Sequence, residues 1–178
     1  MNVSKGIIAF EKKKIDNIII TRSPVETGPS LGFLKGDKEE KFFPYLVPML
    51  DAFEQVLGKK DLDELLRTNI IKAMPIGLMR GTTFKKSCVI LDEGQNCTYD
   101  ELKMFLTRIG NKSKIFLLGD NSQSDLRNTK NTAFSIVKGF LHKIRESVLV
   151  EYTVDDVVRD DIVRDFIIEF ERHEDGIC

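Results

Sequence analysis

The sequence predicts an α/β fold with a mainly parallel sheet and helices on both of its faces. Short β-branched or apolar runs alternate along the chain with amphipathic segments of helical period. Two of the runs, 87–92 and 113–118, end abruptly in polar loops, as the strands of ligand-binding parallel sheets do. The chain has 178 residues, of which 42% are hydrophobic. This is enough for one core, so we expect a single domain over residues 1–178.

Elements of the first half follow from period and turn chemistry. They are, in order, a helical segment in 1–14, a strand at 17–21, an irregular Gly- and Pro-rich loop at 22–37, a helix from Pro44 to Gly58, a short helix at Leu62 to Leu66, and a strand near 70–74. Pro44 can open its helix because proline suits the first turn. Asp61 and Glu64 match a capping box for the next helix.

Elements of the second half are read in the same way. They are, in order, the loop 75–81, a strand at 87–92, a helix from Thr98 to Gly110, a strand at 113–118, a helix around 136–144, a strand at 147–153 and a last helix around 163–170. Thr98 and Glu101 form a second capping-box pattern. Leu102, Phe105 and Ile109 fall on one face of the helix that this box would open.

The most informative stretch is the apolar run that ends in Asp92 and Glu93. Ligands bind beyond the carboxyl ends of parallel strands, so this pattern favours magnesium-assisted phosphoryl transfer. Asp92 fits a residue that holds Mg²⁺, often through water, and Glu93 fits one that orients or deprotonates the attacking water. The alternative is that the pair only begins a turn and caps the following helix.

Gln95 and Gln123 lie in the two polar loops that follow the strands 87–92 and 113–118. Their neutral amides could both reach a terminal phosphate. The alternative for each is an ordinary surface residue of a loop.

Composition excludes several classes of function. The formal net charge is −1, so the whole chain has no electrostatic bias toward nucleic acid or membrane. The three cysteines show no C-x-x-C pairing, which argues against a zinc site or a disulfide framework. No apolar run approaches the ~20 residues that span a bilayer. We therefore expect a cytoplasmic protein without a membrane partner.

Seven blocks of sequence together resemble the PhoH family. They are IIITRSPVE at 18–26, LGFLKGD at 31–37, MRG at 79–81, LDEGQN at 91–96, KMFLTRIG at 103–110, GDNSQSDL at 119–126 and DDVVR at 155–159. The resemblance spans about residues 7–171. It implies a cytoplasmic P-loop ATPase with a RecA-like sheet, related to superfamily 1 helicases, as found in bacteria and in phage-infected cells. It also implies ATP and Mg²⁺ as cofactors.

The resemblance also implies roles for individual residues. Asp92 and Glu93 would be the Walker B pair, and Gln95 and Gln123 would sense the terminal phosphate. Arg159 would be an arginine finger that acts on a neighbouring subunit of a homo-oligomeric ring. The alternative for Arg159 is an ion pair with the acidic residues around it. Separately, Arg22 and Arg80 follow strands in the sequence and are candidates for contact with RNA or another single-stranded nucleic acid, unless they are unpartnered surface arginines.

The sequence departs from the family pattern in one respect, because it contains no G-x-x-x-x-G-K-[ST] loop. The resemblance places a first strand and this loop before the helix that begins at Met1, so we expect an ATPase domain that is incomplete at its amino end. Three explanations stay open: a piece of a longer gene product, a catalytically inactive binding or regulatory module, or one half of a split ATPase. Nuclease activity is not expected, because no cluster of acidic metal ligands accompanies these blocks.

The departure also has a structural consequence. In this fold class the first strand lies inside the sheet, between the strands expected at 113–118 and 147–153. We therefore expect a gap in the sheet there, or closure of those two strands on each other.

Overall fold

The computed structural model describes Ile7 and residues 14–23, 42–120, 132–153, 156 and 161–174. The chain divides into two compact units, Met1–Lys138 and Gly139–Cys178, and each is described by itself. The expectation of one domain stays a prediction.

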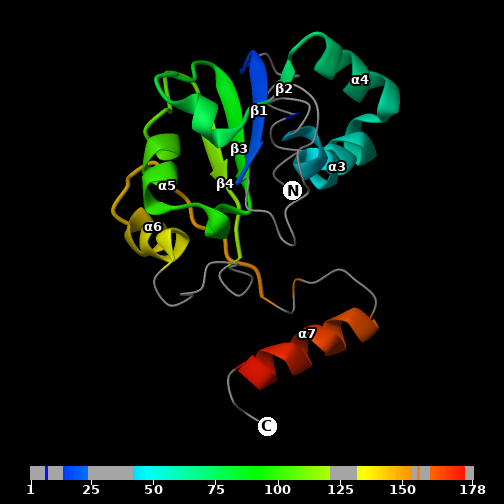
Figure 1. Cartoon of the computed structure of the whole chain (residues 1–178), viewed down its shortest axis with the longest axis vertical. Coiled ribbons are helices and arrows are strands. Elements are labelled where there is room, and N and C mark those ends of the chain that lie inside the picture. Colours follow the sequence, from blue (N-terminus) through cyan, green and yellow to red (C-terminus); the bar gives the residue numbers. More distant parts are fainter. Residues whose placement is uncertain are drawn as a thin grey trace, which may run out of the picture. The chain divides into compact units, whose positions relative to one another are not determined.

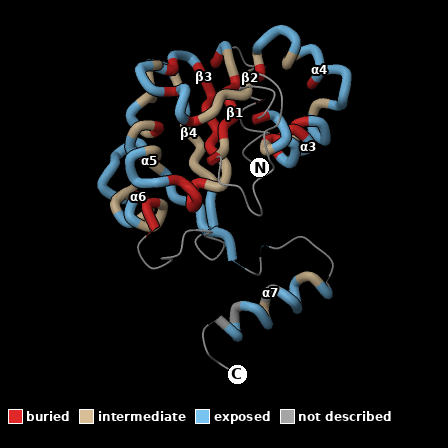
Figure 2. Tube along the Cα trace, in the orientation of Figure 1, coloured by how far each residue is buried: buried red, intermediate tan, exposed pale blue. Residues whose placement is uncertain are grey.

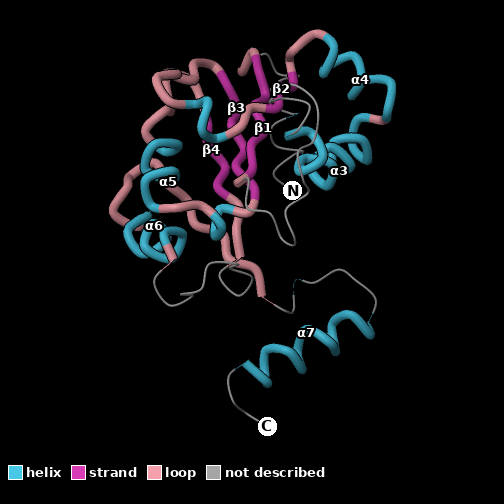
Figure 3. The backbone as a smooth tube through the Cα atoms, viewed as in Figure 1, coloured by secondary structure: helices cyan, strands magenta, loops and turns pink. Residues whose placement is uncertain are grey.

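The first unit is built on a four-stranded sheet (Figures 1 and 3). Its strands are β1 (Asn17–Arg22), β2 (Ile71–Ala73), β3 (Ser87–Asp92) and β4 (Lys114–Leu117), in the order β2-β1-β3-β4. All three pairings are parallel. The predicted α/β class with a parallel sheet is confirmed.

One face of the sheet packs on the helices that follow the first strand. These are the 3-10 helix η1 (Phe43–Leu46), α3 (Val47–Leu57) and α4 (Lys59–Arg67), which lie together beside the sheet in Figure 1. Alternate strand residues such as Ile18, Ile20 and Ile90 join Phe53 in this core, and all four are fully buried. Burial of four such side chains stabilises the fold by roughly 1.5 to 3 kcal/mol each.

The opposite face packs on α5 (Tyr99–Leu106), as Figure 1 shows. The intervening strand residues, among them Val89 and Leu91, are fully buried, as are Leu102 and Phe105 of the helix. The 3-10 helix η2 (Ile76–Met79) contacts α5. The sheet therefore has helices on both faces, and its two central strands, β1 and β3, are largely buried (Figure 2).

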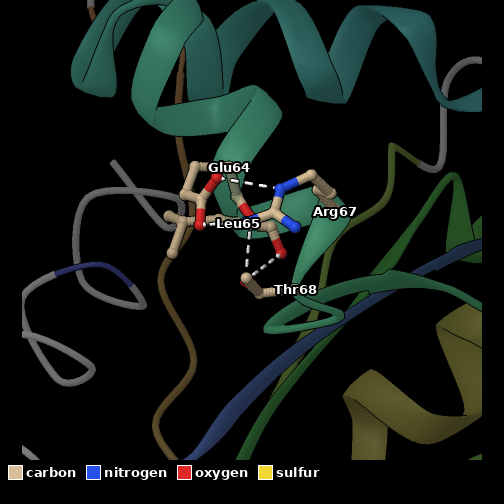
Figure 4. Close-up of polar contacts among 4 residues, drawn as sticks. All are labelled: Glu64, Leu65, Arg67 and Thr68. Carbon is tan, nitrogen blue, oxygen red and sulfur yellow. Dashed lines mark hydrogen bonds and ion pairs between the residues drawn. The ribbon is translucent and has the colours of Figure 1, made fainter.

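The predicted capping box at Asp61 is wrong. Gly58, at φ 79°, ends α3 and is also the residue before α4, so α4 begins at Lys59 and Asp61 falls within its first turn. Glu64 instead accepts two hydrogen bonds from Arg67, at 3.0 and 2.7 Å (Figure 4). The hydrogen bond from Arg67 lowers the pKa of the Glu64 carboxyl.

The capping box at Thr98 is confirmed, but its helix is shorter than predicted. The Thr98 hydroxyl accepts from the Glu101 backbone N–H at 3.3 Å, and the Glu101 carboxylate accepts from the Thr98 N–H at 2.8 Å. The helix ends at Leu106, because Ile109 leaves it to form a parallel bridge with Phe84. A side chain at Gly110 would collide with the Phe84 carbonyl oxygen, so only glycine fits beside this bridge.

The second unit contains the end of α6 (Ala133–Leu141) and α7 (Asp161–Glu174), which confirms both predicted helices. The strand predicted at 147–153 is wrong, since these residues have no regular structure. A strand needs a neighbour for its backbone groups, and no described residue pairs with this segment. Val148 is 84% exposed as a result. No helix among the described residues has the length and apolar character needed to cross a membrane.

Candidate functional site

The carboxyl ends of β1, β3 and β4 meet at one edge of the sheet. The parallel register pairs Arg22 with Asp92 and Leu91 with Leu117. The residues that follow β3 and β4 therefore lie close together, although 25 residues separate Gln95 from Asp120. This edge is where the sequence predicted a phosphate-handling site.

Glu93 is the first residue beyond β3, and its carboxylate contacts two other side chains. Oε1 lies 3.1 Å from Nη2 of Arg22, and Oε2 accepts a hydrogen bond from Nε2 of Gln95 at 2.6 Å. Its backbone is left-handed, with φ 53° and ψ 43°. The side chain of Glu93 is 29% exposed, so solvent still reaches the carboxylate.

Gln95 connects the two loops at this edge. Its side-chain oxygen accepts a hydrogen bond from the Asp120 backbone N–H at 3.0 Å, while its side-chain nitrogen donates to Glu93. The residue is 1% exposed. In this structure both ends of the Gln95 amide are therefore occupied, whereas the sequence prediction had this amide reaching a terminal phosphate.

Arg22 ends β1 and lies at the same edge. Its guanidinium bridges the Glu93 carboxylate and the backbone oxygen of Tyr45, to which Nη1 donates at 3.2 Å. The sequence suggested Arg22 as a contact for nucleic acid, but here it is an ion-pair partner of Glu93. The register between β1 and β3, which no local sequence pattern reveals, produces this pairing.

Close backbone packing fixes the loops around these side chains. Gly94 donates to the Leu118 carbonyl at 2.8 Å, and the Ser23 hydroxyl donates to the Asn96 carbonyl at 2.9 Å. A Cβ at Gly94 would lie 3.0 Å from that Leu118 oxygen, and one at Gly119 would lie 2.9 Å from the Gln95 side-chain oxygen. Both glycines are thus required by close approach.

The alternative role of Asp92 and Glu93 as caps of α5 is not realised. Thr98 and Glu101 cap that helix, and Glu93, which precedes the 3-10 helix η3 (Gly94–Asn96), makes no side-chain capping hydrogen bond. Asp92 is partly buried at the end of β3. Neither carboxylate caps α5, but Glu93 does begin a turn, because its backbone oxygen accepts a hydrogen bond from the Asn96 N–H at 3.0 Å.

Of the other predicted site residues, the structure describes only Arg80. Arg80 follows η2 and is exposed. Gln123 and Arg159 lie outside the described residues. Sequence reasoning missed Ser23 and Tyr45, which act through a hydroxyl and a backbone oxygen and so carry no signal in the sequence.

A ready-made metal site is not found at this edge in the part of the chain that the structure describes. Among the described residues no group of three or more His, Cys, Asp or Glu side chains could hold one. Mg²⁺ is, however, usually bound through one or two carboxylates together with substrate phosphates. Asp92 carries a carboxylate at the end of β3 and is not part of the Arg22 ion pair, so it fits that kind of site.

Two buried thiols, Cys88 in β3 and Cys97 after η3, are held in their neutral form. Burial raises the pKa of Cys88, within β3, to about 11. Burial, and secondarily the Glu101 carboxylate, raise the pKa of Cys97 to about 12. Neither thiol is therefore a nucleophile at neutral pH.

Comparison with known proteins gives a consistent result. A sequence model of the family described as "PhoH-like protein" matches residues 1–171. The chain is 43% identical over 157 residues to a PhoH-like protein of Bacillus subtilis, covering 88% of this chain and 49% of that protein. It is 35% identical over 173 residues to a PhoH-like protein of Mycobacterium bovis, covering 97% and 49%. It is 41% identical over 128 residues to Protein PhoH of Escherichia coli K12, covering 71% and 36%. The chain spans about half the length of the first two of these relatives.

Proposed function

This chain belongs to the PhoH-like protein family, and on that premise we propose that the strand-end cluster is the hydrolytic half of a Mg·ATP site in a RecA-like P-loop ATPase. The observation that carries the proposal is the carboxylate pair Asp92 and Glu93 at the carboxyl end of β3, a strand with neighbours on both sides. Substrates bind at this edge of parallel sheets.

The proposed division of work follows from the positions of the two carboxylates. Asp92 would hold Mg²⁺, which supplies neutralisation of phosphate charge when bound. Glu93, partly exposed and fixed in orientation, would align the attacking water and accept its proton. Gln123, as a contact to the terminal phosphate, and Arg159, as a finger reaching the next subunit of a ring, are proposals that rest on the family resemblance.

The proposal requires phosphate-binding groups that this sequence does not supply in the usual form. It contains no G-x-x-x-x-G-K-[ST] motif, whose backbone N–H groups and lysine would hold the phosphates. We therefore assign hydrolysis to a polypeptide in which these residues work together with such a loop. A non-hydrolysing binding module is the competing function.

The experiment compares ATP hydrolysis by this chain and by the same chain joined at its amino end to a strand and phosphate-binding loop of a PhoH-like relative. We expect Mg-dependent hydrolysis only in the longer polypeptide. Glu93→Gln should lower its kcat by about 10²-fold or more while ATP binding persists, because the amide cannot accept the proton of the attacking water. Glu54→Gln, on the exposed surface of α3, is the matched control and should leave kcat unchanged.

Three outcomes would contradict the proposal. Full activity of the Glu93→Gln polypeptide would remove Glu93 from the chemistry. Absence of hydrolysis in the longer polypeptide would instead favour the binding module. Substantial turnover by the present chain alone would show that the phosphates are held without the loop.

RNA or another single-stranded nucleic acid is the proposed partner of this ATPase, on the family resemblance and on the exposure of Arg80. Arg22 supports this less, because its guanidinium is already bound to Glu93 and Tyr45. Binding of labelled RNA and DNA oligonucleotides to Arg80→Ala measures the contribution of Arg80. Unchanged affinity would exclude it from the binding surface.

A further inference from the structure

Glu93 is held from two directions by groups on different elements. Arg22, at the end of the neighbouring strand, contacts Oε1 at 3.1 Å, and Gln95 donates to Oε2 at 2.6 Å. One carboxylate oxygen thus lies in an ion pair and the other accepts a hydrogen bond. The carboxylate has one orientation in this structure, set by contacts outside its own backbone.

The two donors are themselves anchored. The Arg22 guanidinium also donates to the Tyr45 backbone oxygen at 3.2 Å, and the Gln95 oxygen accepts from the Asp120 N–H at 3.0 Å. Planar guanidinium groups can bridge two acceptors in a fixed geometry, which a single ammonium point charge does less well. The side chains of Arg22 and Glu93 are only 24% and 29% exposed, so water screens their attraction less than it screens a surface pair.

We propose that Arg22 is a positioning residue, which holds the Glu93 carboxylate in the orientation needed to accept a proton from water. The inference rests on the proposed function and assigns it a further residue. A general base acts only within hydrogen-bond reach of its proton, and a displacement of ~1 Å can cost ~10²-fold in rate. Through Tyr45, Arg22 also ties the orientation of Glu93 to η1, on the face of the sheet that α3 covers.

The first part of the experiment tests the contact in the present chain. Arg22→Gln, Glu93→Gln and the double variant are compared by their urea midpoints. If Arg22 and Glu93 act as a pair, the double variant loses less stability than the sum of the single variants. The matched control is the Glu64–Arg67 pair of Figure 4, which has a shorter ion-pair distance of 2.7 Å but exposed side chains, 56% and 72%. Its variants should be nearly additive.

The second part measures steady-state hydrolysis in whichever of the two polypeptides hydrolyses ATP. Arg22→Ala should lower kcat by about 10- to 100-fold with KM changed less than about twofold, because substrate binding does not use this contact. Arg22→Lys should recover part of the loss, since it keeps the charge but not the bridge to Tyr45. Arg67→Ala, which removes an arginine paired with a surface glutamate, should leave both constants unchanged.

The outcomes separate the inference from the function on which it rests. An active polypeptide whose kcat is unchanged or raised by Arg22→Ala would overturn the positioning role and leave the ATPase proposal standing. Additive behaviour of Arg22 and Glu93 would likewise overturn it. If no unsubstituted polypeptide hydrolyses ATP, the proposed function fails, and the role of Arg22 in it fails as well.

Discussion

Glu93 has a backbone conformation that residues other than glycine seldom adopt. Four described non-glycine residues have positive φ: Asn69, Lys86, Glu93 and Lys112. A left-handed residue costs about 1 to 2 kcal/mol, so the surrounding contacts must hold it in place. At Glu93 these contacts come from Arg22 and Gln95, and from Gly94, whose N–H is bonded to the Leu118 carbonyl. The strain falls on the residue that we assign to proton transfer.

The burial of two thiols, those of Cys88 and Cys97, leads us to expect that the protein loses stability at alkaline pH. Burial raises the pKa of Cys88 to about 11 and that of Cys97 to about 12, from an ordinary value of 9.0. As the pH rises above about 9, the thiols therefore ionise in the unfolded chain before they ionise in the folded one. The free energy of unfolding falls with pH until the pKa values of the folded state are passed. We expect the free energy of unfolding to fall by roughly 1 to 2 kcal/mol for each thiol between pH 8 and pH 10.5. Urea titrations across this range measure the fall.

Other groups, among them lysines and tyrosines, also titrate in this range, so a matched variant is needed. Cys88→Ala should have a lower free energy of unfolding at pH 8. Above pH 9 that free energy should fall less steeply than in the unsubstituted chain, because only one of the two buried thiols remains to ionise. An identical slope in the variant would mean that the thiols do not carry the pH dependence.

The position of a residue could be predicted from sequence where the pattern around it was local. Asp92 and Glu93 stand directly after an apolar run, and the strand end follows from that run alone. The pairing of Glu93 with Arg22 could not be predicted, because it depends on the register between β1 and β3, whose residues are about 70 positions apart in the sequence. The contact between the Gln95 side-chain oxygen and the Asp120 N–H could not be predicted for the same reason, because that N–H lies in the loop after another strand.

Two helices begin with similar capping patterns in the sequence, but substitution of the first residue of each pattern should cost different amounts of stability. Thr98 is the residue before α5 and forms both hydrogen bonds of the box, whereas Asp61 lies inside the first turn of α4. Thr98→Ala should therefore lower the free energy of unfolding by about 1 kcal/mol. Asp61→Ala should cost at most a few tenths, because it loses only a favourable charge near the helix amino end. Urea midpoints of the two variants check this, and equal losses would contradict it.

The structure also shows why the sequence alone could not reveal that the capping box predicted at Asp61 does not form. The pattern Asp-x-x-Glu is satisfied, but Gly58 at φ 79° changes the chain direction earlier and starts α4 at Lys59. Similarly, the apolar pattern of 147–153 favours a strand, yet a strand requires a partner that sequence periodicity does not reveal. Helices with a clear apolar period, such as α3 and α7, were predicted, although Pro44 opens the 3-10 helix η1 and α3 itself begins at Val47.

For the whole molecule, the core and the sheet belong to one of the two units. All residues of the buried core cluster, from Ile7 to Ile90, and all four strands lie within Met1–Lys138. β4 ends the strand order, and no described segment pairs with its outer side. An edge of this kind can accept a further strand, which is compatible with a longer ATPase in which another segment completes the sheet.

This arrangement predicts that the first unit folds without most of the second. A chain that ends at Ser147 keeps α6 and the hydrogen bond from the Ser147 hydroxyl to the Leu141 carbonyl, at 2.6 Å. It loses residues whose described side chains are largely exposed, among them Val148, Tyr152 and Phe166, at 84%, 61% and 59%. Because the described side chains that are removed bury little apolar surface, we expect the free energy of unfolding to change by less than about 1 kcal/mol. Urea unfolding followed by circular dichroism, with amide NMR spectra of the strands, tests this in both chains. Loss of the cooperative transition, or displaced resonances of β1 and β3, would show instead that Val148 to Cys178 stabilises the sheet. The first unit would then not be stable by itself.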